Sequence, residues 1–92
     1  MIFEWDEGKN QSNVEKHGIS FEESKQAFFD PNRIITEDIT HSSGSEKRYF
    51  CFGQTSSGII TVRFTYRSKK IRIIGAGLWR QGKKKYEEEN SI

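Results

Sequence analysis

The sequence predicts one α+β domain spanning residues 1–92, with two N-terminal helices packed on a mostly antiparallel β-sheet meander and a C-terminal helix after it. Three observations support this fold class. Helix-start signals occur twice in the first 30 residues, and runs of aromatic and β-branched residues fill the stretch from residue 33 to residue 75. Finally, 92 residues with 21 Ile, Val, Leu and Phe can form only one small core.

The first predicted helix covers residues 7–17. Asp6 suits its N-cap, because a carboxylate there accepts a hydrogen bond from a free N–H group of the first turn. Gly18 suits the position just after its end. Val14 is nearly the only apolar residue of the segment, so the helix has little apolar surface with which to hold the sheet.

The second predicted helix begins with Ser20-Phe21-Glu22-Glu23, which has the S-x-x-E form of a capping box. Phe21, Ala27 and Phe28 then share one face at helical spacing. Asp30-Pro31-Asn32 ends this helix, because proline disfavours helical geometry in the residue before it and Asp and Asn favour turns.

The strand pattern begins at Ile34-Ile35-Thr36, and a polar loop follows over residues 40–45. Turn residues at Ser56-Ser57-Gly58 and Ser68-Lys69 divide the next stretch into three predicted strands, over residues 47–55, 59–67 and 70–75. These runs predict an antiparallel meander.

The turns also predict the strand register. A two-residue loop at Ser68-Lys69 brings apolar residues together, with Tyr66 opposite Ile71 and Phe64 opposite Ile73, and it pairs Thr65 with Arg72. A three-residue loop at Ser56-Ser57-Gly58, with the glycine left-handed, places Phe52 opposite Val62 and Phe50 opposite Phe64 on the same face. The opposite face then presents Arg63, Thr65, Arg67, Lys70 and Arg72, with Tyr49 and Cys51 among them.

Gly75-Ala76-Gly77 predicts a hinge or tight connection that brings Trp79 and Arg80 back toward this basic face. Helical character resumes over residues 78–92. This last segment carries Arg80 and three lysines, and then the acidic run Glu87-Glu88-Glu89.

The net charge of +2 hides a strong asymmetry along the chain. Residues 1–38 carry nine acids and four bases (−5), residues 39–86 carry one acid and eleven bases (+10), and residues 87–92 carry three acids (−3). A solvated charged face is the simpler explanation of a single basic run. Eleven bases against one acid instead favour an anionic partner.

Metal-independent RNA cleavage requires a base for the 2′-hydroxyl, an acid for the leaving 5′-oxygen and cations that stabilise the charge on phosphorus. The predicted catalytic residues are Arg67, Arg72 and Arg80 on the phosphate, with His41 or Glu46 for proton transfer. Glu46 equally suits an ion pair with a neighbouring arginine. His17 is expected to be a structural residue at a helix end.

The predicted RNA-binding residues are Arg48, Arg63, Lys70, Lys83, Lys84 and Tyr49. Tyr66, Trp79 and Tyr86 are further aromatic candidates for base stacking. The register places Tyr66 in the core, and packing is the simpler expectation for Trp79.

Several classes of protein are excluded by the sequence. No apolar run reaches the roughly 18 residues that span a membrane, and the N-terminus lacks the features of a signal peptide, so we expect a cytoplasmic protein without membrane contact. Cys51 is the single cysteine and is expected to be a buried small hydrophobe. No cysteine and histidine cluster has zinc spacing, and we expect no metal or cofactor.

Segments over most of the chain resemble the BrnT family of bacterial type II toxins. The matching residues are Phe3-Glu4-Trp5-Asp6 with Lys9 and Asn13, Lys16-His17-Gly18-Ile19-Ser20-Phe21-Glu22-Glu23, Phe28 with Asp30-Pro31, Asp38 with His41-Ser42, Glu46-Lys47-Arg48-Tyr49 with Gly53, Thr65-Tyr66-Arg67, and Ile71-Arg72-Ile73-Ile74 with Ala76.

The resemblance implies a RelE-like fold and a ribonuclease that inhibits translation. It also implies a BrnA-type antitoxin that neutralises the toxin, contacts DNA on its behalf and forms an oligomeric complex with it. By position, Arg67 and Arg72 match arginines of the family. Gly75 and Gly77 stand where the family usually has serine and arginine, so Arg80 is expected to replace the lost arginine, or the chain is a weak or inactive module that binds RNA or the antitoxin.

Overall fold

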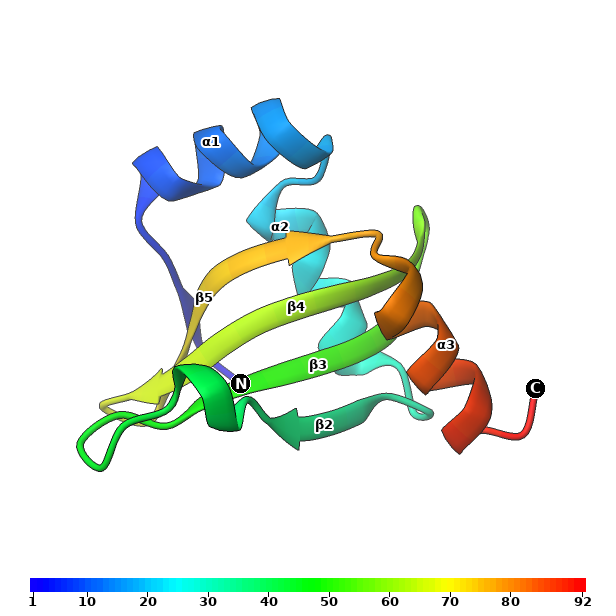
Figure 1. Ribbon diagram of the computed structural model, residues 1–92. Coiled ribbons are helices and arrows are strands. Elements are labelled where there is room, and N and C mark those ends of the chain that lie inside the picture. The colour runs from blue at the N-terminus through cyan, green and yellow to red at the C-terminus, as the bar shows by residue number, and fades with distance from the viewer.

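The computed structural model describes all of residues 1–92, and its centre is a five-stranded sheet in the order β1-β5-β4-β3-β2 (Figure 1). The strands are β1 (Phe3–Glu4), β2 (Ile34–Glu37), β3 (Arg48–Thr55), β4 (Gly58–Arg67) and β5 (Lys70–Gly77). Strands β2 to β5 form the predicted antiparallel meander. β1 was not predicted, because two residues are too short for a pattern, and it pairs parallel to β5.

The core lies on one face of the sheet, under a helical layer that comprises α2 (Phe21–Ser24) and the 3₁₀ helix η1 (Lys25–Phe29). This layer lies behind the sheet in Figure 1. Ser20 caps α2 by accepting a hydrogen bond from the Glu23 N–H at 3.0 Å, as the capping box predicted. The predicted apolar face is also confirmed, since Phe21, Ala27 and Phe28 are all buried, and Phe28 packs edge-on against Phe64.

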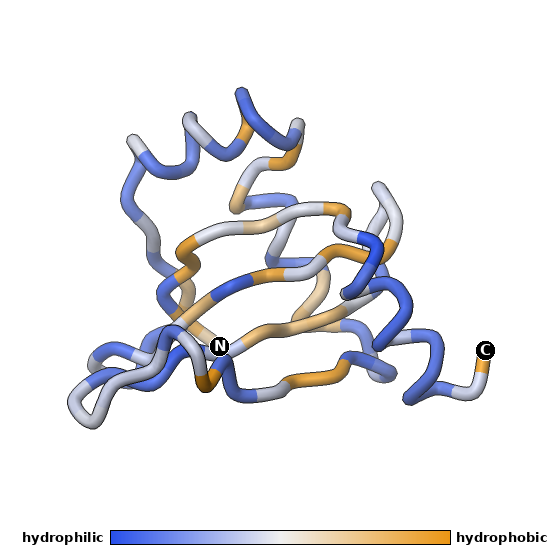
Figure 2. The backbone as a smooth tube through the Cα atoms, in the orientation of Figure 1, coloured by the Kyte–Doolittle hydropathy of each residue, from blue (hydrophilic) through white to orange (hydrophobic).

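Helix α1 (Glu7–His17) has the predicted ends but a different position. Asp6 accepts from the Lys9 N–H at 2.9 Å, and Gly18 is left-handed with φ 69°. α1 does not join α2 over the core, however. It contacts the end of β5 and is almost entirely hydrophilic (Figure 2). Val14 is 43% exposed and does not belong to the core, so only the second helical segment covers the sheet as expected.

The register of β4 and β5 is confirmed, but that of β3 and β4 is wrong by one residue. Ser68 and Lys69 form a two-residue turn with φ 52° and 65°. Phe64 pairs with Ile73 and Thr65 with Arg72, as predicted. The other loop contains only Ser56 and Ser57, because Thr55 already pairs with Gly58.

A shift of one residue moves every side chain of a strand to the other face. Tyr49 and Cys51 therefore lie on the core side, opposite Phe64 and Val62, instead of on the basic face. Phe50 takes their place there, opposite Arg63. Cys51 is fully buried, which confirms the expectation of a buried small hydrophobe, and burial raises the pKa of its thiol to about 12.

The predicted hinge at Gly75-Ala76-Gly77 is wrong, since β5 continues through Gly77. A β-bulge interrupts the pairing instead, between Arg63 opposite Gly75 and Phe64 opposite Ile73. The chain turns only after Gly77, and the Trp79 indole folds back onto it. A Cβ at Gly77 would lie 2.6 Å from that ring, so the close approach requires glycine.

Helix α3 (Arg80–Glu89) packs on the face of the sheet opposite the core, which we call the open face. Gly82 lies against Thr61 and Phe52, and the Tyr86 hydroxyl donates a 2.6 Å hydrogen bond to Asp30. The loop with the 3₁₀ helix η2 (Ile39–His41) lies at the other end of the sheet in Figure 1. None of the helices is long and apolar enough to span a lipid bilayer.

Candidate functional site: a basic cavity between α1 and the sheet

A cavity of about 340 Å³ lies where α1 meets the open face of β4 and β5, and we call it the α1 cavity. Its walls carry three basic side chains and a histidine, and no acidic residue lines it. The lining residues are Lys9, Ser12, Asn13, Lys16, His17, Arg63, Ile74, Gly75 and Trp79. The chemistry of this wall is therefore suited to an anion.

One face of α1 supplies five of these residues. Positions 9, 12, 13, 16 and 17 follow the i, i+3, i+4, i+7, i+8 spacing of a single helix face. In most surface helices the face toward the sheet is apolar. Here the inward face is polar, so α1 covers the sheet edge with cations and leaves a cavity between them.

Asn13 holds α1 in this position through its buried side-chain amide. Its Nδ2 donates to the carbonyl oxygens of Ile19 and Ala76, both at 2.9 Å. Its Oδ1 accepts from the Ala76 N–H at 3.1 Å. The amide thus pairs with the backbone of β5 much as another strand would, and this fixes the distance between α1 and Arg63.

The cations of the α1 cavity are not neutralised by the protein. None of the six ion pairs in the structure involves Lys9, Lys16 or Arg63. The open-face arginines farther along the sheet differ, because Arg67 pairs with Glu46 at 2.9 Å and Arg72 with Glu4 at 3.4 Å. Unpaired cations around a concave surface raise the local concentration of anions.

His17 sits at the mouth of the cavity, at the C-terminal end of α1. Its ring meets the Trp79 indole edge-on, with centroids 5.2 Å apart and an interplanar angle of 76°. The imidazole is exposed and lines the same cavity as Lys16 and Arg63, so a ligand bound there can contact it. Sequence reasoning had assigned this histidine a structural place only.

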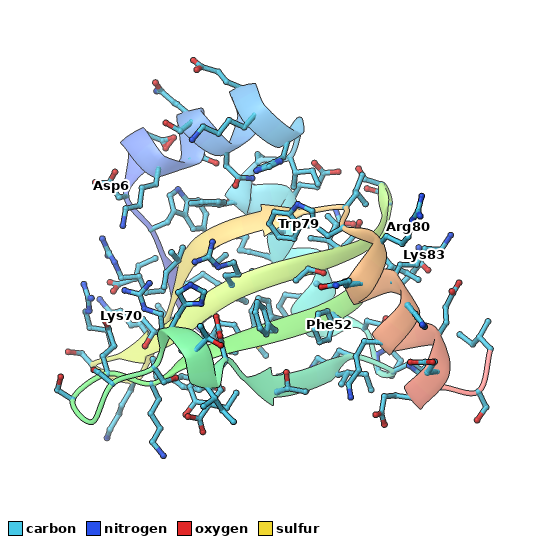
Figure 3. All side chains as sticks on the ribbon, viewed as in Figure 1. Asp6, Phe52, Lys70, Trp79, Arg80 and Lys83 are labelled. Atoms are coloured by element: carbon cyan, nitrogen blue, oxygen red, sulfur yellow. The ribbon has the colours of Figure 1, made fainter.

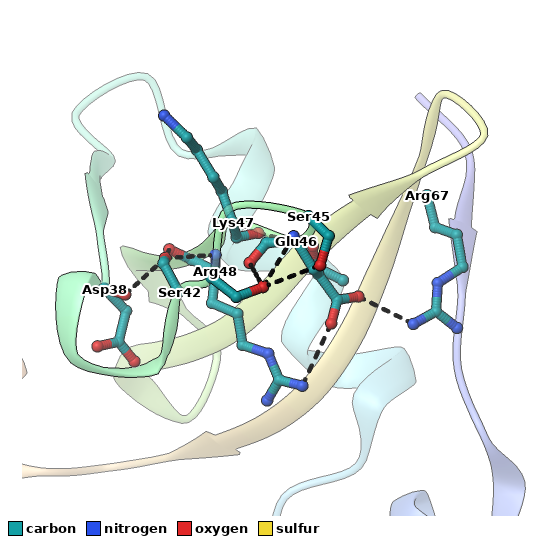
Figure 4. Close-up of polar contacts among 9 residues, drawn as sticks. Asp38, Ser42, Ser45, Glu46, Lys47, Arg48 and Arg67 are labelled. Atoms are coloured by element: carbon teal, nitrogen blue, oxygen red, sulfur yellow. Dashed lines mark hydrogen bonds and ion pairs between the residues drawn. The ribbon is translucent and has the colours of Figure 1, made fainter.

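The predicted proton-transfer residue Glu46 is an ion-pair partner (Figure 4). It binds Arg67 and also Arg48, the latter at 3.4 Å. The hydrogen bond from Arg67 is the main reason that the pKa of Glu46 lies below its ordinary value. A carboxylate stabilised in this way is a weaker base.

The other predicted catalytic residues lie in separate places. His41 Nδ1 is 2.8 Å from Oδ2 of the buried Asp38, in the loop around η2. Arg72 pairs with Glu4 at the β1 side of the sheet. Arg80 lines a different cavity. The structure therefore does not bring these residues into one cavity.

The predicted RNA-binding residues are also dispersed. Arg63 lines the α1 cavity and Lys83 lines the second cavity, whereas Lys84 lines neither. Figure 3 shows Lys70 at the opposite end of the sheet from Arg80 and Lys83. Tyr49 stacks on Phe64 on the core side, with centroids 5.5 Å apart.

Of the three further aromatic candidates for base stacking, only Trp79 lines a cavity. Tyr86 is buried, and its hydroxyl donates a hydrogen bond to Asp30, so its ring offers no exposed surface for stacking. Tyr66 lies on the core-side face, as the register predicted, although it is 54% exposed at the sheet end. Trp79 lines both cavities and is 37% exposed.

Sequence reasoning missed Lys9, Ser12 and Lys16 as site residues, and it set His17 aside. Their spacing was the available signal, because positions 9, 12, 13, 16 and 17 share one helix face and all carry polar side chains. It was hidden because these residues belong to the acidic part of the chain, whose net charge is −5.

A family model matches most of the chain. A family model described as "Ribonuclease toxin, BrnT, of type II toxin-antitoxin system" matches residues 5–82, which include every residue lining the α1 cavity. A search of curated proteins found no match.

Proposed function

Because the chain belongs to the BrnT family of ribonuclease toxins of type II toxin-antitoxin systems, we propose that it is an endoribonuclease that cleaves RNA in the α1 cavity. The observation that carries this proposal is the set of unpaired cations around a concave wall without acids. A phosphodiester is the part of RNA that such a wall recognises.

The proposed reaction is an attack of the 2′-hydroxyl oxygen on the adjacent phosphorus. Neutral His17 takes the hydroxyl proton, and an ammonium group of Lys9 or Lys16 donates a proton to the leaving 5′-oxygen. The P–O5′ bond breaks as the new P–O2′ bond forms. The products are a 2′,3′-cyclic phosphate and a 5′-hydroxyl.

Arg63 is proposed to stabilise the transition state. Its guanidinium keeps its charge at all relevant pH values and can bind two phosphate oxygens at once. Its position on β4, next to the bulge, gives it a rigid support, because the sheet fixes its backbone. With His17 as base, Lys9 or Lys16 as acid and Arg63 on the phosphate, the proposed steps require no metal ion.

The loop around η2 is a second candidate location for proton transfer. The Asp38 carboxylate near Nδ1 of His41 orients that imidazole and leaves Nε2 free. Arg67 and Arg48 both donate hydrogen bonds to the carboxylate of Glu46, which follows the same loop. This arrangement keeps the predicted roles of His41 and Arg67 open to the same test, and the roles of Glu46 and Arg72 stay predictions.

The family also supplies a proposed partner. Type II systems pair a toxin with a protein antitoxin, and we propose a BrnA-type antitoxin that forms an oligomeric complex with this chain and contacts DNA for it. We further propose a RelE-like toxin that inhibits translation. Growth arrest on expression, relieved by the co-expressed antitoxin, is the expected result, and harmless expression of folded protein would instead indicate a binding module.

The test of the active site is RNA cleavage by the purified chain in the presence of a chelator. We expect cyclic-phosphate products and a rate loss of about 100-fold or more in His17→Ala and Arg63→Ala. Lys47→Ala is the matched control, because Lys47 is exposed, unpaired and outside both cavities. Losses in His41→Ala and Arg67→Ala, with His17→Ala unchanged, would move the site to the η2 loop.

A further inference from the structure

A second cavity of about 410 Å³ lies on the other side of Trp79, between the β3-β4 turn and the start of α3. We propose that it is a subsite for the neighbouring nucleotide of a single-stranded RNA, an inference that rests on the proposed function of the α1 cavity. Trp79 would then be the platform on which a base stacks between two bound phosphates.

Trp79 is shared by both cavities, and it is the only residue that lines both. Its indole contacts the backbone at Gly77 and packs in a T-shaped arrangement with the His17 ring. The side chain still exposes 37% of its surface. A fixed and partly exposed indole is what base stacking requires, because little side-chain freedom is lost on binding.

Apolar surface continues from the indole into the second cavity. Leu78 is 53% exposed and lines the same wall as Ile59. Exposed leucine and tryptophan side by side offer an apolar contact for one base or ribose. The α1 cavity has only Ile74 and Trp79 in this role, so the two cavities differ in chemistry.

Arg80 and Lys83 provide the cations of the second cavity, and neither forms an ion pair. They lie at the N-terminal end of α3, while Glu87, Glu88 and Glu89 lie at its C-terminal end. This order is the reverse of the one that stabilises a helix dipole. Helix stability therefore does not account for the positions of Arg80 and Lys83, and both side chains line the second cavity.

Glu87 is the one acid of this wall, and it faces the same space as Lys83 without pairing with it. Its negative charge weakens the binding of any anion in this cavity. We therefore expect Glu87→Gln to tighten the binding of the second phosphate, with Glu88→Gln, which is outside the cavity, as the matched control.

A single-stranded RNA fits these features better than two other polyanions. A base in a duplex is already stacked and paired, so it cannot cover the indole. An acidic peptide would satisfy the cations but has no planar group for Trp79. The alternation of cations, indole and cations matches the alternation of phosphate, base and phosphate along one strand.

The test compares two non-cleavable RNAs with 2′-deoxy sugars at the scissile positions, a dinucleotide with one phosphate and a trinucleotide with two. Affinity is read from Trp79 fluorescence in a Trp5→Phe background, in which Trp79 is the only tryptophan. We expect the third nucleotide to improve affinity about tenfold. Lys83→Ala should reduce this gain to threefold or less, and Lys84→Ala should leave it intact.

The outcomes separate the two proposals. Arg63 lines only the α1 cavity, so dinucleotide binding that is insensitive to Arg63→Ala would overturn the proposed function. An equal gain from the third nucleotide in Lys83→Ala and Lys84→Ala would overturn the second subsite while leaving the first. A duplex or an oligoglutamate that binds as tightly as the trinucleotide would also overturn the subsite for a single strand.

Discussion

Single residues decide where α1 lies and therefore whether the cavity exists. Asn13 is the clearest case, since one buried amide pairs with the backbone of Ile19 and of Ala76. No apolar side chain of α1 replaces it, because Val14 is largely exposed. The helix is thus held by hydrogen bonds with a defined geometry instead of by a broad hydrophobic contact.

Replacing Asn13 with alanine should destabilise the protein by about 2 to 3 kcal/mol, because buried carbonyl and N–H groups of the backbone lose their partner. Urea unfolding of both proteins measures this difference. Gln11→Ala is the control, as Gln11 lies on the exposed side of the same helix. Equal stability of the two variants would show that α1 is held in another way.

Asp30 and Tyr86 form a second residue-scale contact, and it is sensitive to pH. Burial alone would raise the pKa of Asp30, but hydrogen bonds from the Tyr86 hydroxyl and from the N–H groups of Gln54 and Asn32 lower it below 3.8. The same bond to Asp30, together with burial, raises the pKa of Tyr86 from 10.0 to about 12.

The resulting stability has a defined pH window. Because the pKa of Asp30 is lower in the folded state, its contribution is lost as pH falls below about 4. Because the pKa of Tyr86 is raised, its contribution is lost between about pH 10 and 12. We expect Tyr86→Phe to cost about 1 to 2 kcal/mol at pH 7 and much less at either extreme. Urea unfolding at several pH values measures this, and a difference that does not change with pH would refute it.

At the scale of elements, the sequence predicted those with strong local signals. The caps at Asp6, Gly18 and Ser20 and the turn at Ser68-Lys69 are all confirmed, because each depends on only a few neighbouring residues. The loop at Ser56-Ser57 was assigned one residue too many. Gly58 allows a left-handed turn residue, but in the structure it begins β4 with φ 118°.

The positions of α1 and α3 could not be predicted from local patterns. Both helices are hydrophilic, so neither has an apolar stripe that points to its partner (Figure 2). α3 approaches the sheet through Gly82, and α1 through Asn13. Such contacts depend on the shape of the facing strand, and the sequence of the helix alone does not predict that shape.

The close contact at Gly82 predicts that alanine at this helix position lowers stability, although Gly→Ala in a helix usually raises it. In a helix, Gly→Ala normally stabilises by about 1 kcal/mol. At Gly82 a Cβ would lie against Thr61 and Phe52, so we expect Gly82→Ala to destabilise by about 1 to 3 kcal/mol and to displace α3. Thermal or urea unfolding measures this. Gly44→Ala, in open space, should be close to neutral, and a stabilised Gly82→Ala variant would contradict the close packing of α3.

At the scale of the whole molecule, the charge asymmetry along the chain is only part of the surface charge. The basic segment from residue 39 to residue 86 supplies Arg63, Arg80 and Lys83, as expected. The acidic first 38 residues nevertheless supply Lys9 and Lys16 to the same region. Net charge per segment misses this, because the acids of that segment lie outside the cavity.

Folding also selects among the cations of the basic segment. Arg48 and Arg67 share Glu46, and Arg72 pairs with Glu4 of the neighbouring β1. β1 was not predicted, so the partner of Arg72 could not be anticipated. The predicted basic face is therefore partly neutralised, whereas Arg63, Arg80 and Lys83, which line the two cavities on either side of Trp79, form no ion pair.

The central claim, that RNA binds in the α1 cavity beside His17, is tested most directly by NMR of the two histidine imidazoles. The chain contains only His17 and His41, so the two sets of resonances can be assigned with one His→Ala variant each. On addition of the non-cleavable dinucleotide, we predict that the His17 resonances shift and that the His41 resonances do not. Shifts confined to His41, or none at either ring at saturating ligand, would contradict the assignment of the site.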